Sequence, residues 1–534
     1  MKRINIILLA AVLFLLSGCC LFGKYASDVT APDNLFGDED MIGTVDAGSS
    51  LGELSWRELF TDPELQELID TALVRNADLV AAGLRVRQAE ASLQSARLGY
   101  LPSLSLSPSI YITPDQGYTL PLSGSWGVDG FGSITNRKRE AEVLALQAAD
   151  YEQTVRSQLI ASVAKAYYQL ELITRQKEIV TEAAEIWTKV VDTQRALMEN
   201  GKSYSAAVLQ MEANMTSISI AQTELDNSIR DIESALCLLL MQTPQPIRCG
   251  TFMNTRYRLP ESVSVGIPAL ILENRADVRA AGRSVEAAYY VTNQARAALF
   301  PSLSISGLIG WGTDGMPVSN PADLVYNALA SLTQPVFMQG RLRANLKIQK
   351  LRQQEAASVY AQTILKAGNE VGAALRACSL AEEKDVLYKQ KVSALENAYS
   401  ATQELMKSAK STYIEVLIAQ ESLLESQRDE AANLYDGTLA AKTLGQMVSP
   451  ATAEAAEGAL YAMLGNPAVK KMIVGSYVLA NSSWPIQVPL GQIPAVWSGV
   501  VDLKTGEIMK CAMIGCIIRV IYACLVANFF GLFF

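Results

Sequence analysis

The chain has 534 residues, of which 50% are hydrophobic, and a formal net charge of −9 with no histidine. This hydrophobic content predicts a folded body, and the negative charge argues against a nucleic-acid partner, which favours a basic surface. The absence of histidine removes His-dependent triads and His-ligated zinc or haem. Since there is also no glycine-rich phosphate loop and no CxxC pair, we expect no enzyme, no catalytic residue, no metal site and no cofactor.

The first residues are typical of an export signal. Two basic residues precede an apolar run at 4–16, which is too short for a comfortable membrane span. The run ends in Leu16-Ser17-Gly18-Cys19, which resembles a bacterial lipobox. This resemblance implies a lipoprotein signal peptide at 1–18, a lipid on Cys19 and, because Cys20 rather than Asp follows, delivery to the outer membrane. An ordinary secretory signal and an uncleaved anchor are the alternatives.

A unit of about two hundred residues occurs twice in the chain. The segment PSLSLS at 102–107 recurs 199 positions later as PSLSIS at 301–306. Farther along, Gly132 matches Gly340 at an offset of 208. A nine-residue insertion, the difference between the two offsets, therefore lies in the second unit.

Short segments with alternating apolar and small polar residues predict β-strands. They form two hairpins, one per repeat, at 102–113 with 117–126 and at 301–311 with 327–337. Four strands cannot close a barrel, so several chains must contribute if these strands cross a membrane. A small soluble β-subdomain is the alternative. The insertion places an expected external loop at 311–323.

Long runs without proline or glycine predict helices of unusual length. Residues 133–200 contain neither residue, and 202–243 form a second such run. In the second repeat, only Gly368 and Gly372 interrupt residues 341–436. Each repeat is therefore expected to form a helical hairpin, with its tip at 199–202 or 407–410. A plain antiparallel coiled coil is the alternative for these helices alone.

The remaining features leave alternatives open. Cys237 and Cys249 flank a Thr-Pro-Gln-Pro turn and are either a disulfide in an oxidising compartment or two free thiols. Cys378 has no obvious partner. Residues 511–534 are almost continuously apolar and are long enough for a membrane helix, although Arg519 interrupts them. A tail packed on the rest of the protein and a reading-frame artefact are the other interpretations.

Several segments together resemble the TolC-like outer-membrane efflux family, in its lipoprotein branch. The resemblance covers about residues 50–447, and four separated segments carry it in the expected order: SALCLLLMQTP at 234–244, IPALILENRADVRAAGRSVEAA at 267–288, ARAALFPSLSISGLIG at 295–310 and YIEVLIAQESLLESQRDEAANLY at 413–435. It implies a fold that is mainly α with a small β portion, in which long α-hairpins and β-hairpins are duplicated. The implied organisation is a signal peptide at 1–18, a lipidated segment at 19–50, a first repeat at 51–243, a linker at 244–268, a second repeat at 269–447 and an extension of unknown role at 448–534.

The resemblance also implies an assembly and its partners. Three chains would form a homotrimeric channel, with a twelve-stranded β-barrel in outer-membrane lipid and a twelve-helix α-barrel across the periplasm. The helical tips would meet a periplasmic adaptor, the membrane fusion protein, and an inner-membrane efflux transporter. The protein itself would be a passive exit duct. A lipid-anchored periplasmic coiled-coil structural or adaptor protein is the alternative, and the two strand pairs favour the duct.

Site residues follow from the same resemblance. The family places acidic residues just after the second tip, where this chain has Glu415, but the second commonly acidic position is Ile418. A ring of Glu415 side chains would concentrate cations at a constriction, and the equivalent residue of the first repeat is Ala207. The remaining candidates are Tyr413 and Lys410 for the gate, and Asn200, Gly201, Lys202 and Ser408 for adaptor contacts.

Overall fold

The computed structural model describes residues 23–26, 56–111, 117–201, 204–250, 275–314, 323–408 and 413–448. All of them belong to the first of two compact units, Met1–Thr452, and the second unit is Ala453–Phe534. The predictions for the signal peptide, Cys19, Lys202, Lys410 and the apolar end of the chain therefore lie outside the described residues.

The described chain is mainly helical, as the sequence predicts. Its helices are α2 (Trp56–Leu59), α3 (Pro63–Arg75), α4 (Ala77–Leu98), α5 (Ser133–Glu199), α6 (Ser205–Leu239), α8 (Ala276–Ala297), α9 (Arg341–Lys407) and α10 (Tyr413–Val448). Within these helices, none combines the length and the apolar character needed to cross a membrane.

The helices repeat as the two sequence offsets predict. The helices α4 and α8 each have 22 residues, and α5 and α9 each have 67. Gly132 and Gly340 precede the two long helices with φ angles of 74° and 76°, a left-handed conformation that glycine adopts without steric cost. Gly368 and Gly372 do not interrupt α9, because Ala367 and Val371 beside them are buried in helix packing.

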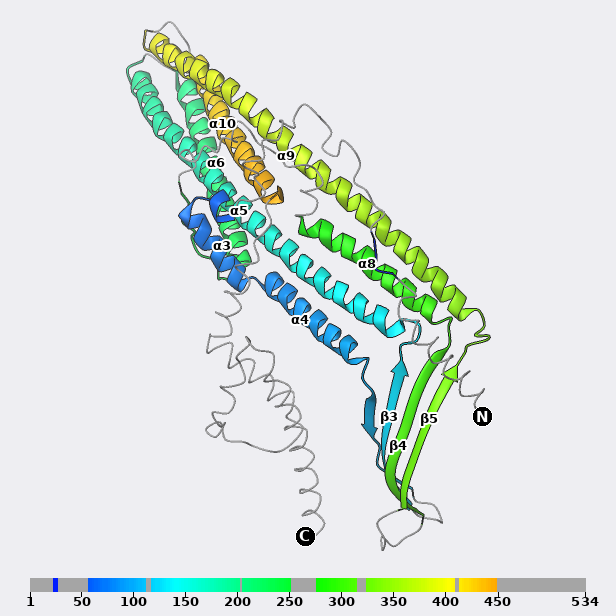
Figure 1. The fold of residues 1–534 in the computed structure, drawn as a ribbon. Helices are drawn as coiled ribbons and strands as arrows, with labels where there is room; N and C mark the ends of the chain where they lie inside the picture. The colour runs from blue at the N-terminus through cyan, green and yellow to red at the C-terminus, as the bar shows by residue number, and fades with distance from the viewer. Residues whose placement is uncertain are drawn as a thin grey trace, which may run out of the picture. The chain divides into compact units, whose positions relative to one another are not determined.

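Four helices form a row in the order α4–α5–α8–α9, each packed against the next. Figure 1 shows this row beside the sheet, and the tips of both hairpins at the opposite end. The helix α6 packs on α5, and α10 packs on both α9 and α5. The main hydrophobic core lies where α3 and the ends of α6 and α10 cover α5, around Leu65, Tyr167 and Leu236.

The strands form one antiparallel sheet in the order β1-β3-β4-β5, with β2 also pairing with β3. Their bounds are β1 Ser103–Leu106, β2 Ser109–Tyr111, β3 Gly117–Val128, β4 Ser302–Asp314 and β5 Asp323–Thr333. The repeats share one register, since Ser103 pairs with Ser125 and the equivalent Ser302 pairs with Thr333. The duplication is therefore structural as well as sequential.

Three strand predictions need correction. The strand predicted at 102–113 is two strands, because Pro108 has no N–H to donate to the ladder. The strand predicted to begin at Asn327 begins at Asp323 and ends at Thr333, before Pro335. The strand β4 continues to Asp314, so the external loop predicted from Trp311 begins farther along the chain.

The cysteines of the described residues are unpaired. Cys237, Cys249 and Cys378 are free thiols, so the structure selects the second of the two alternatives for the first pair. The Cys237 thiol donates to the backbone oxygen of Gln245 at 3.6 Å, and Cys249 lies 3.8 Å from the Thr174 hydroxyl. The thiols of Cys237 and Cys249 therefore each have a local polar partner in place of a disulfide.

A close approach between β3 and β4 requires glycine. A Cβ on Gly310 would lie 2.5 Å from the backbone oxygen of Leu120, whereas a Cβ on Gly127 would meet nothing within 4 Å. We expect Gly310→Val to lower the free energy of unfolding by about 1–3 kcal/mol through overpacking. Thermal unfolding followed by circular dichroism measures the change. The control Gly127→Val should unfold like the wild type, and equal effects of both substitutions would contradict this prediction.

Candidate functional site at the helical tips

The first tip ends α5 with a compact cap. The backbone nitrogen of Asn200 donates to the oxygen of Ala196 at 3.2 Å, and its side-chain Nδ2 donates to the same oxygen at 2.7 Å. Gly201 follows with a φ of 71°, and its N–H donates to the oxygen of Met198 at 2.9 Å. This is a glycine-terminated helix end, in which the last carbonyls are satisfied locally.

The second tip reproduces this cap with another residue. The nitrogen and Oγ of Ser408 donate to the oxygen of Glu404 at 3.1 and 3.0 Å. The cap residues Asn200 and Ser408 have nearly the same backbone angles, −86° and 10° against −86° and 7°. Both therefore have a structural role at the tips, whatever else they contact.

The two repeats differ in the first turn of the helix that follows each tip. The helix α6 begins at Ser205 and α10 at the equivalent Tyr413, and the next-turn valines Val208 and Val416 are both buried. Between them, the first repeat has a buried Ala207 and the second has an exposed Glu415. A carboxylate in the first turn of a helix is favoured by the helix dipole.

Exposed isoleucines flank this carboxylate. The side chain of Ile414 is 50% exposed, and that of Ile418, three residues after Glu415 and on the same helix face, is 56% exposed. The site is thus one acidic position beside an apolar one, and the second acid of the family pattern is absent. Tyr413 is the first residue of α10, and the position of its side chain is outside the described set.

Within each hairpin, polar side chains connect the two helices, and the two hairpins use different residues for this. These contacts were not predicted from the sequence for either hairpin. In the first, exposed Arg195 pairs with Glu212 at 2.7 Å, and this hydrogen bond raises the pKa of the guanidinium. The equivalent residues of the second hairpin are Gln403 and Gln420, joined by neutral hydrogen bonds through Tyr399. Comparing the copies at an offset of 208 would have found this exchange of an ion pair for amides.

The hairpins also pack against each other. Leu417 of α10 contacts the cluster of Trp187, Val191 and Met211 in the first hairpin. A cavity of about 210 Å³ lies between α5, α6 and α10, and Gln420 and Arg428 are among its lining residues. The helix that carries Glu415 is therefore attached to the first repeat as well as to α9.

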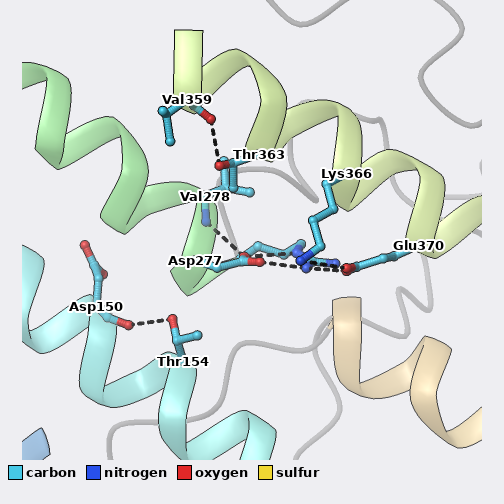
Figure 2. A network of polar contacts seen from close by, with 9 residues as sticks. Asp150, Thr154, Asp277, Val278, Val359, Thr363, Lys366 and Glu370 are labelled. Carbon is cyan, nitrogen blue, oxygen red and sulfur yellow. Dashed lines mark hydrogen bonds and ion pairs between the residues drawn. The ribbon is translucent and has the colours of Figure 1, made fainter. Parts of the chain in front are cut away.

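Farther from the tips, polar contacts connect the row of helices. Arg275 donates to Asp277 at 2.7 Å and to Glu370 of α9 at 2.8 Å, and Lys366 adds a contact of 3.8 Å to the same Glu370 (Figure 2). On the other side of α8, Arg279 pairs with Asp150 of α5 at 2.8 Å. These contacts join α8 to both of its neighbours.

A partly buried acidic cluster joins three distant segments. The hydroxyl of Tyr167 in α5 donates to Asp62 at 2.6 Å and accepts from the N–H of Gly250 at 2.9 Å. Glu171, one turn farther along α5, is 4% exposed. Burial, with the charges of Asp62 and Glu64, raises the pKa of Glu171 to about 8.

The family follows from comparison with known proteins. The family model described as outer membrane efflux protein matches residues 68–240 and 267–448, which include both hairpins and both strand pairs. The chain belongs to the outer membrane efflux protein family. It is an outer-membrane channel of an efflux system, and the family is not enzymatic. The match over both repeats favours this function over a lipid-anchored coiled-coil structural or adaptor protein.

Individual relatives cover most of the chain. It is 28% identical over 448 residues to the pyoverdine export outer membrane protein OpmQ of Pseudomonas aeruginosa, covering 79% of this chain and 93% of that one. It is 26% identical over 425 residues to the cation efflux system protein CusC of Escherichia coli K12, covering 77% and 92%. The solved Campylobacter jejuni CmeC outer membrane channel has the same fold, with a TM-score of 0.70 at 19% identity, covering 81% and 95%.

The buried Glu171 predicts a pH-dependent stability. Between the ordinary glutamate pKa and about 8, the folded chain binds a proton that the unfolded chain does not. The free energy of unfolding should therefore fall as the pH rises through this window. The variant Glu171→Gln lacks this titration, so its stability relative to the wild type should increase from pH 5 to pH 8.5 in denaturant unfolding. Exposed Glu185 of the same helix supplies the control Glu185→Gln, and a wild-type pH slope in Glu171→Gln would contradict the assignment.

Proposed function

We propose that the protein is the passive exit duct of a tripartite efflux pump and works as a homotrimer. The open sheet carries this proposal, because its edge strands β1 and β5 have no partner on their outer sides among the described residues. Leu104 of β1 is 70% exposed and Leu329 of β5 is 58% exposed. An open edge is not viable in lipid, so further copies must close the sheet around a pore.

The partners of the duct are an inner-membrane transporter and a periplasmic adaptor. The names of the relatives give different cargo, with cation efflux in one case and pyoverdine export in another. A passive duct accommodates such differences, so the transporter selects the cargo and supplies the energy. The adaptor contacts are the tip residues Asn200, Gly201, Lys202 and Ser408, beside which Tyr204 is 85% exposed.

The gate lies at the start of α10. Three copies bring three Glu415 carboxylates to the tip end of the tube, with Ile418 forming an apolar ring one turn farther along the helix. Acidic rings concentrate cations, and apolar constrictions obstruct water and ions. Tyr413 and Lys410 complete the set of gate residues.

Single-channel recording tests the gate and the duct together. Wild-type protein in a planar bilayer should conduct and be blocked by divalent cations from the tip side. We expect Glu415→Gln to need about tenfold more cation for half-block, equivalent to ~1.4 kcal/mol. The control Glu404→Gln removes an exposed acid from the descending helix near the same tip and should leave block unchanged. Unaltered block in Glu415→Gln would refute the gate, and a wild type without conductance would refute the duct.

Lipid attachment at Cys19 anchors each chain to the outer membrane. Two adjacent cysteines offer a matched comparison, since Cys20 directly follows the lipobox cysteine. Cells that express Cys19→Ser should incorporate no labelled palmitate into the protein and should retain the signal peptide. The Cys20→Ser variant should be labelled and processed like the wild type. Label lost from Cys20→Ser but kept in Cys19→Ser would reverse the assignment.

A further inference from the structure

The row of helices ends in two faces that have no partner among the described residues. The helix α4 packs on α5 and α9 packs on α8, and α4 and α9 do not pack against each other in the described part of the chain. On α4, Val80 and Leu84 are 39% and 49% exposed, and on α9, Ile348 and Leu351 are 48% and 55% exposed. Each helix thus presents apolar side chains on a single face.

The contact between α5 and α8 is an internal template for joining these faces. Val143 of α5 is buried against Ala287 and Tyr290 of α8. One turn farther along α5, Gln147 donates to Ser284 at 2.6 Å. These residues define how α5 of the first repeat packs on α8 of the second repeat.

The template can be applied to α9 and α4 because equivalent residues meet in the two repeats, between α4 and α5 in the first and between α8 and α9 in the second. A Cβ on Gly83 of α4 would meet Glu152 of α5 at 3.8 Å, and one on Gly282 of α8 would meet Tyr360 of α9 at 3.5 Å. These two contacts are related by the offsets of 199 and 208. Applied to the template, the offsets take α5 to α9 and α8 to α4.

The contact residues of α5 and α8 differ in charge from their equivalents on α9 and α4, and the differences on the two helices are complementary. Gln147 and Ser284 become Glu355 and Arg85, which have opposite charges and are both exposed. Conversely, the ion pairs from Asp150 to Arg279 and Arg283, at 2.8 and 3.9 Å, are replaced at all three positions by uncharged residues. Those replacements are Ser358 on α9 with Val80 and Leu84 on α4.

We propose that α9 of one copy packs on α4 of the next copy in the α5–α8 register, with Glu355 paired to Arg85 of the next copy. This proposal rests on the homotrimer of the proposed function and specifies its interface. In the single chain, the Arg85 guanidinium lies over the ring of Tyr151 of α5, 5.7 Å from its centroid, so pairing with Glu355 of the neighbouring copy requires the guanidinium to turn from this ring. Leu351, equivalent to Val143, becomes buried against the next copy's α4.

The sheet supports the same register independently. Val128 at the end of β3 pairs with Leu303 of β4. Their equivalents are Val336 and Leu104, which are 93% and 70% exposed. Val336 lies three residues beyond the end of β5, so its pairing with Leu104 of the next copy requires this segment to extend the strand in the assembled trimer, where two of the most exposed apolar side chains would then be covered.

Charge reversal tests the ion pair. Glu355→Arg and Arg85→Glu each place two like charges at every boundary, so both trimers should dissociate at a lower temperature than the wild type in gels of unboiled, detergent-purified protein. The double variant restores opposite charges and should recover the wild-type temperature. Glu383→Arg, on an exposed part of α9 outside this face, is the control and should leave it unchanged.

The outcomes separate the interface from the proposed function. A wild type that is not a trimer overturns both. A trimeric wild type with no destabilisation in the single variants, or no recovery in the double variant, overturns the ion pair and leaves the homotrimer standing.

Cysteine cross-linking tests the strand register without altering charge. Residues directly opposite each other on antiparallel strands are close enough for a disulfide. Leu104→Cys with Val336→Cys should give covalent dimers and trimers on non-reducing gels, while each single substitution, which retains the native cysteines, should not. The pair Leu104→Cys with Phe337→Cys shifts the register by one and turns the second thiol to the other face. Equal or stronger cross-linking by the shifted pair overturns the register.

Discussion

The seam between the two repeats, where β3 pairs with β4 and α5 packs on α8, is the contact on which the rest of the chain depends. All twelve residues of β3 are paired with β4, from Gly117 to Val128. The helices above the seam meet through apolar contacts at Val143 and through the pair of Asp150 with Arg279. Because the repeats are equivalent, the residues that form this seam have counterparts at the two open edges, on α4 and β1 at one edge and on α9 and β5 at the other. A closed channel then needs only further copies of the same contact.

The equivalence of the two repeats is broken in their helical hairpins. The hairpin cross-link changes from Arg195 and Glu212 to Gln403 and Gln420, and the first turn after the tip changes from Ala207 to Glu415. The exposed ion pair contributes little stability, whereas Gln420 of the amide pair is buried, so the exchange also changes the interior of the hairpin. In the proposed trimer, the two kinds of hairpin alternate at the tips, and one kind carries the acid.

A polar cluster on α5 connects the beginning and the end of the first repeat. Tyr167 connects Asp62, which also caps α3 through the N–H of Glu64, to Gly250 after α6. A neutral Glu171 beside them avoids placing a second charge in a site of low polarity. This cluster fixes the segments that enter and leave the first repeat, far along the helices from the tips.

The sequence by itself determined the repeat, the helix lengths and the hairpin tips. Those features depend on local chemistry, as in the absence of proline and glycine between Ser133 and Asn200 and the turn at Gly201. The long second helix is expected in spite of Gly368 and Gly372, and in α9 the burial of Val371 and Ala367 outweighs a helix-propensity cost of about 1 kcal/mol per glycine.

Only the tertiary structure decided which polar groups are buried and which faces are left open. Nothing in the local sequence distinguishes Glu171 from the many exposed glutamates, because its environment comes from Asp62 and Gly250, distant in the chain. Likewise, the pairing proposed between Leu104 and Val336 of neighbouring copies derives from the observed pairing of Val128 with Leu303, which the sequence alone does not show. Burial and register are properties of segments brought together by folding, and a single segment does not carry them.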